Sequence, residues 1–76
     1  MEDNLPDDLR SDIREVSAPL VESLQTRGWR VGVIQWENQT TRSVSFVAKT
    51  SKGEPVHVSC GEEDLPNRLK KLLESS

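Results

Sequence analysis

The chain has 76 residues, of which 33% are hydrophobic and 30% charged, so it is long enough for one small domain and contains no apolar run of membrane-spanning length. A single cysteine excludes an intramolecular disulfide, and the lack of a secretory signal pattern leads us to expect a cytoplasmic protein. The net charge of −3 is unevenly distributed, because residues 1–16 hold six acidic residues and two arginines while residues 17–76 are nearly neutral.

This uneven charge suggests a division into an acidic, partly helical N-terminal arm over residues 1–16 and an α-β-β-β-α domain over residues 17–76. A solvated helix face is the simplest interpretation of the acidic residues. The alternative is an arm that covers a basic surface or imitates a nucleic acid.

The first predicted helix is indicated by apolar residues that recur at steps of three and four, namely Leu9, Ile13, Val16, Leu20 and Leu24. Pro19 interrupts this stripe but does not change its phase. We therefore expect one kinked helix, or two nearly collinear helices with Ser17 capping the second, ending at Arg27-Gly28.

Three strands are predicted over residues 29–37, 43–49 and 56–60, from their β-branched content and alternation. In the first strand, Trp29, Val31 and Val33 share one face and Arg30, Gly32, Ile34 and Trp36 share the other. A closing helix is predicted from Asp64-Leu65-Pro66 to about Glu74, with Asp64 as N-cap and Glu62 and Glu63 at the positive end of the helix dipole.

The order of elements predicts an α+β fold, a two-layer α-β-β-β-α arrangement with a three-stranded antiparallel sheet and both helices on one face. The expected core comprises Leu20, Leu24, Trp29, Val31, Val33, Val44, Phe46, Val56, Val58, Leu65, Leu69 and Leu72. The open face of the sheet would then present the candidate partner-binding residues Arg30, Ile34, Trp36, Val47, Lys49 and His57. A register error of one residue would exchange the two faces.

The end of the chain resembles the HicA (YcfA-like) toxin family in Gly53, Val56-His57-Val58, Gly61 and Asp64-Leu65-Pro66, and Leu24 to Trp29 resembles its first helix end. The resemblance covers about residues 20–74, and double-stranded-RNA-binding domains share the same element order. It implies this fold and, for HicA, cleavage of messenger RNA by a histidine on the second strand. The matching segment here, residues 41–46, has no histidine, so the resemblance does not carry over that activity.

The lysine cluster of double-stranded-RNA-binding domains is replaced by Glu62, Glu63 and Asp64, which would repel RNA.

Chemical groups suited to catalysis are sparse in this sequence. His57 is the one histidine, with no evident carboxylate to orient it, and we interpret it as a surface residue rather than an acid–base catalyst. Cys60 falls on the opposite strand face, so the two do not form a metal site, and no cofactor, metal or small-molecule substrate is expected.

We therefore expect a non-enzymatic domain that docks on a protein partner through its open sheet face, its acidic arm, or both. The alternatives are a HicA-type RNA-binding or RNA-cleaving protein, in which His57 or Arg30 replaces the missing histidine, and a homodimer formed through the open face. RNA binding requires the cations Arg27, Arg30, Arg42, Lys49 and Lys52 to gather on one surface.

Overall fold

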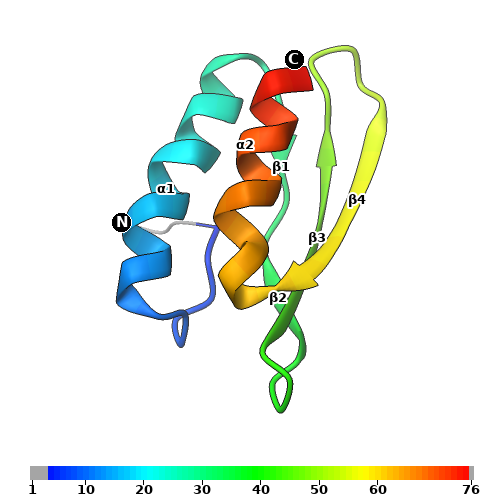
Figure 1. The fold of residues 1–76 in the computed structure, drawn as a ribbon. Helices are drawn as coiled ribbons and strands as arrows, with labels where there is room; N and C mark the ends of the chain where they lie inside the picture. The colour runs from blue at the N-terminus through cyan, green and yellow to red at the C-terminus, as the bar shows by residue number, and fades with distance from the viewer. Residues whose placement is uncertain (1–3, 76) are drawn as a thin grey trace.

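The computed structural model describes residues 4–75, which form two α-helices and a four-strand antiparallel sheet. Helix α1 spans Ser11–Thr26, and helix α2 spans Leu65–Ser75 after a 3-10 turn at Glu62–Asp64. The strands are β1 (Arg30–Val31), β2 (Gln35–Asn38), β3 (Ser43–Lys49) and β4 (Pro55–Gly61). Both helices lie on one face of the sheet and run in the same direction (Figure 1). This confirms the predicted α+β class and its two layers.

The sheet is centred on β3, and the predicted first strand is divided into β1 and β2. β4 pairs with β3 along one edge, whereas β1 and β2 both pair with the other edge. Arg30 lies opposite Lys49 and Gln35 lies opposite Ser45, so five steps along the chain correspond to only four along β3. The extra residue forms a β-bulge, which explains why four strands replace the expected three.

This bulge reverses the side-chain alternation, so the predicted positions of three residues are wrong. Val33, predicted in the core, is 65% exposed, and Ile34, predicted on the open face, is 1% exposed. Trp36 was also predicted on the open face, but it lies opposite Val44, which is fully buried on the helix side. Directly opposed residues share one face of a sheet, and therefore Trp36 lies on the helix side too.

Helix α1 continues through Pro19 as one helix, which is the first of the two arrangements expected from the sequence. Ser17 is fully buried within it rather than capping a second helix. The helix ends at Gly28, whose φ of +92° is a left-handed conformation that glycine adopts without strain. There the Trp29 amide donates to the Leu24 carbonyl at 3.1 Å, and the Gly28 amide donates to a carbonyl within the last turn at 3.0 Å. These bonds form a Schellman motif, and the helix stop predicted at this glycine is confirmed.

The N-terminal segment from residue 4 packs with the rest of the chain. Leu5, Leu9 and Ile13 are buried in the same core as the sheet. Asn4 covers the outer side of the bulged strand, because its side chain donates to the Val31 carbonyl at 2.6 Å and its carbonyl accepts from the Ile34 amide at 2.7 Å. The division drawn between residues 16 and 17 therefore marks a change in charge but no break in packing, and residues 1–3 of the arm lie outside the described residues.

The core fills the space between the helices and the sheet with residues from every α-helix and strand except β2. Its buried apolar members are Leu5, Leu9, Ile13, Val21, Leu24, Trp29, Val31, Ile34, Val44, Phe46, Ala48, Val58, Leu65 and Leu69. Three predicted core residues, Leu20, Val56 and Leu72, are only partly buried at its margin.

Candidate functional site

The open face of the sheet brings together four of the six residues predicted to bind a partner. Arg30 lies directly opposite Lys49, and Val47 lies directly opposite His57, so each pair shares this face. All four are exposed, and Val47 presents 51% of its surface to solvent. The sequence placed these residues on the correct face, because β3 and β4 pair without interruption and Arg30 precedes the bulge in the first predicted strand.

The bulge adds Val33 to this face, a residue that the strand pattern assigned to the core. Val33 is the most exposed large hydrophobic residue among those described, and it shares a shallow depression with Val47. The depression is lined by Gly32, Val33, Gln35, Ser45, Phe46, Val47 and His57. An isolated glycine within a strand is a signal for a bulge, and Gly32 gave that signal in the sequence.

Gly32 is required at this position by the close approach of β3. Its amide donates to the Val47 carbonyl at 2.9 Å, and a β-carbon on residue 32 would lie 2.8 Å from that same oxygen. A side chain here would push the two strands apart. The glycine thus permits the close strand pairing beside the bulge, where Val33 faces solvent and Ile34 faces the core.

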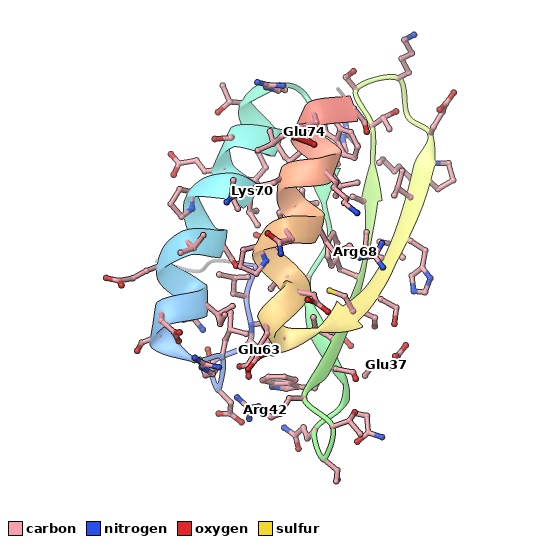
Figure 2. The ribbon with its side chains drawn as sticks, viewed as in Figure 1. Glu37, Arg42, Glu63, Arg68, Lys70 and Glu74 are labelled. Carbon is pink, nitrogen blue, oxygen red and sulfur yellow. The ribbon has the colours of Figure 1, made fainter. Side chains whose placement is uncertain are left out.

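Trp36 belongs to a polar cluster at the end of the molecule where both helices begin. The guanidinium of Arg42 lies 4.3 Å from the centroid of the Trp36 ring, a cation–π geometry. Figure 2 shows Arg42 and Glu63 at this end. Arg42 has a φ of 55°, at the last position of the loop that joins β2 to β3. Trp36 is therefore a packed residue and was wrongly assigned to the open face.

Glu62 is the buried centre of this cluster, at 4% exposure. Both of its carboxylate oxygens accept hydrogen bonds from Arg42, at 3.2 and 2.8 Å, and one also accepts from the Arg10 amide at 3.0 Å. Arg42 additionally donates to the Asp8 carbonyl at 3.0 Å. The hydrogen bonds from Arg42 hold the pKa of Glu62 below its usual range. The cluster joins the segment before α1, the loop after β2 and the turn before α2. Its charged residues therefore have a structural role in holding these three segments together.

Groups for acid–base or metal chemistry do not converge on the open face. The His57 side chain makes no hydrogen bond to another residue within 4–75, while the nearby Ser59 hydroxyl donates to Glu37 at 2.9 Å. Burial raises the pKa of the Cys60 thiol, which disfavours the nucleophilic thiolate. In the described part of the chain, no three histidine, cysteine or acidic side chains are grouped to hold a metal ion.

Three of the five cations named for RNA binding gather at the opposite end of the sheet. Arg30, Lys49 and Lys52 line one hollow, formed where the turn before β1 meets the turn between β3 and β4. Arg27 instead donates to the Leu73 carbonyl at 2.9 Å, and Arg42 lies with Glu62 at the far end. The basic surface is therefore smaller than the predicted RNA-binding surface.

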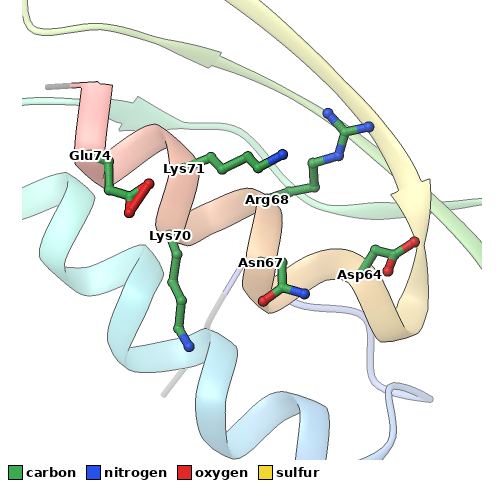
Figure 3. Close-up of a pocket in the computed structure, with 6 residues that line it drawn as sticks. All are labelled: Asp64, Asn67, Arg68, Lys70, Lys71 and Glu74. Atoms are coloured by element: carbon green, nitrogen blue, oxygen red, sulfur yellow. The ribbon is translucent and has the colours of Figure 1, made fainter.

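A hollow along the exposed side of α2 and the turn before it is lined by the charged residues Asp64, Arg68, Lys70, Lys71 and Glu74 and by the neutral Asn67 (Figure 3). Arg68 and Lys71 extend toward β4, whereas Lys70 points to the other side of the helix. The positive charge of Arg68 acts on Cys60 of β4, which places its guanidinium near that strand.

Comparison of the chain with protein-family models, with curated proteins and with solved structures gave no match. Within residues 4–75, neither helix has the length and apolarity needed to cross a membrane.

Proposed function

We propose that this protein is a non-enzymatic binding domain whose open sheet face docks on a protein partner. The observation that carries the proposal is the depression in which Val33 and Val47 are exposed side by side with His57. Two large β-branched side chains in one exposed depression gain free energy when a partner covers them, because apolar area leaves water.

The charges around this depression favour a partner with an apolar centre and an acidic rim. Arg30 and Lys49 lie opposite each other, next to Val47, and neither forms an ion pair with another described residue. Unpaired cations at the rim of an interface increase association rates with an acidic partner and exclude basic ones. The acidic N-terminal segment contributes less to docking, because Leu5 and Leu9 hold it against the core.

The test uses a matched pair of valine substitutions. Val47→Asp places a charge in the depression, whereas Val16→Asp changes a valine of α1 that is 46% exposed and lies outside it. Proteins captured by the wild-type domain are purified and titrated by calorimetry against all three forms. The proposal requires a partner whose binding is lost with Val47→Asp and retained with Val16→Asp. Equal binding to both variants, or no saturable binding to the wild type, contradicts it.

An RNA-acting protein of the HicA type is the second candidate, favoured by the hollow that Arg30, Lys49 and Lys52 share. Titration with labelled structured and single-stranded RNA tests it directly. RNA binding through this hollow would weaken steeply with salt and with Lys49→Glu. Cleavage that disappears with His57→Ala would replace our first proposal with this one.

A further inference from the structure

The two edges of the sheet differ in how their backbone groups are protected. The edge formed by β1 and β2 contains the bulge and a second register shift between Trp36 and Asn38. Asn4 also occupies part of this edge, through its bonds to the backbone of Val31 and Ile34. Interruptions and covering segments of this kind prevent another chain from pairing with an edge.

The opposite edge, β4, has none of these protections. Its seven residues pair with β3 in an unbroken register from Pro55 to Gly61. It contains no lysine, arginine, aspartate or glutamate, and only the proline at its first position interferes with strand addition. Within residues 4–75, no strand pairs with its outer side (Figure 1). A long, regular and uncharged edge strand is a template for another strand.

Two cations of α2 are placed beside this free edge. Arg68 and Lys71 both extend toward β4, as Figure 3 shows, and neither forms an ion pair with another described residue. Val56 and Cys60 lie on the helix side of β4 and are only partly buried. A strand added beside β4 would cover these two residues and present alternate side chains to the two cations.

We propose that β4 binds an extended acidic segment of a partner protein, which adds to the sheet as a further strand. Main-chain hydrogen bonds to the free edge provide the affinity, and carboxylates on the helix side of the added strand select the segment by meeting Arg68 and Lys71. This site is separate from the depression around Val33 and Val47, and it does not depend on the function proposed for that face.

Titration of the isotope-labelled protein with a short peptide of alternating glutamate and valine tests the proposal by NMR. We expect amide shifts concentrated on β4 and α2. A peptide of alternating lysine and valine should bind much more weakly. The glutamate–valine peptide methylated on every backbone nitrogen should also bind weakly, because neither of its edges can donate a hydrogen bond to β4.

The matched variants reverse charge on opposite sides of one helix. The double substitution Arg68→Glu and Lys71→Glu should weaken binding of the glutamate–valine peptide by about tenfold, whereas Lys70→Glu should leave it unchanged. Val47→Asp should also leave it unchanged, which separates this site from the open face. Equal binding of the methylated peptide, shifts confined to the open face, or self-association of the protein through β4 in place of peptide binding would overturn the proposal.

Discussion

Arg42 and Glu62 form a reciprocal pair that joins the loop after β2 to the turn before α2. The side chain of Arg42 donates to both carboxylate oxygens of Glu62, and the Glu62 amide donates to the Arg42 carbonyl at 2.8 Å. The carboxylate is nearly inaccessible, while the arginine side chain is 43% exposed. A buried carboxylate with three hydrogen-bond donors is stable only while those donors remain.

The first prediction concerns Glu62→Gln. The amide nitrogen of glutamine would face a donor, either on Arg42 or at the Arg10 amide, so at least one hydrogen bond is lost. We expect the free energy of unfolding to fall by about 1–3 kcal/mol in urea denaturation. Glu63→Gln is the matched control, because the Glu63 side chain is 80% exposed and its substitution should cost much less. An equal fall in the free energy of unfolding for Glu62→Gln and Glu63→Gln would show that the buried hydrogen bonds of Glu62 do not stabilise the fold.

The second prediction concerns the dependence of stability on pH. Arg42 lowers the pKa of Glu62 in the folded protein, so this carboxylate stabilises the fold above its unfolded pKa of about 4.3. That stabilisation is lost as the pH falls through the lower folded pKa. The difference in unfolding free energy between wild type and Glu62→Gln should therefore be constant near neutral pH and shrink below about pH 4. If the difference in unfolding free energy between wild type and Glu62→Gln does not change with pH, this prediction is contradicted.

A smaller acid dependence should remain in the Glu62→Gln variant. Asp12 also has a lowered pKa, because Arg10 donates a hydrogen bond to it. This pair is exposed, with 63% of the Asp12 side chain accessible, and solvent weakens its contribution. Adding Asp12→Asn should flatten the remaining acid dependence slightly.

The sequence predicted the fold because helix and strand periods are local properties. The alternation of β3 and the stop at Gly28 each involve neighbouring residues and agree with the structure. The predicted apolar stripe agrees at Leu9, Ile13 and Leu24, but Leu20 is only partly buried and Val16 is 46% exposed, so the prediction of Val16 on the buried stripe is wrong. The bulge was missed because residues 29–37 alternate acceptably in either register. The contact between Gly32 and the Val47 carbonyl that decides the register depends on pairing with another strand.

Part of the candidate site could be predicted because strand periodicity is a local property, as it is for the fold. Val47, Lys49 and His57 lie on regular strands, and the period of two placed them correctly on the open face. Glu62 follows Gly61 just before a helix, where acidic residues commonly interact with the helix dipole. Its ion pair spans twenty residues of sequence, and no local pattern distinguishes it from its exposed neighbour Glu63.

The third prediction tests the bulge through Gly32→Ala. The new β-carbon would lie 2.8 Å from the Val47 carbonyl oxygen, so the strands must separate. We expect a loss of about 1–3 kcal/mol in unfolding free energy. Gly61→Ala is the control, because Gly61 has a φ of −70° and its added β-carbon would approach no more closely than 3.9 Å to Asp64. A neutral Gly32→Ala would show that the strands pair differently here.

The fourth prediction compares the two residues whose faces the bulge exchanges. Ile34→Val should cost about 0.5–1.5 kcal/mol, because it removes a methyl group from a site that is 1% exposed. Val33→Ala removes more atoms but from a residue that is 65% exposed, and it should change stability by less than about 0.5 kcal/mol. Thermal unfolding of both variants measures this. A larger loss of stability for Val33→Ala than for Ile34→Val would favour the uninterrupted strand predicted from the sequence, with Val33 in the core.

The last prediction concerns Ser17, which is fully buried in α1 and whose hydroxyl has no hydrogen-bond partner within residues 4–75. Ser17→Ala removes this unpaired polar group and introduces a residue that favours helix, so the protein should become more stable by about 1 kcal/mol. Ser23→Ala is the control, because Ser23 is exposed in the same helix and its substitution changes only helix propensity. Urea denaturation should therefore rank Ser17→Ala as the more stabilising. A loss of stability specific to Ser17→Ala would contradict this prediction, because it would mean that the Ser17 hydroxyl does form a hydrogen bond inside the fold.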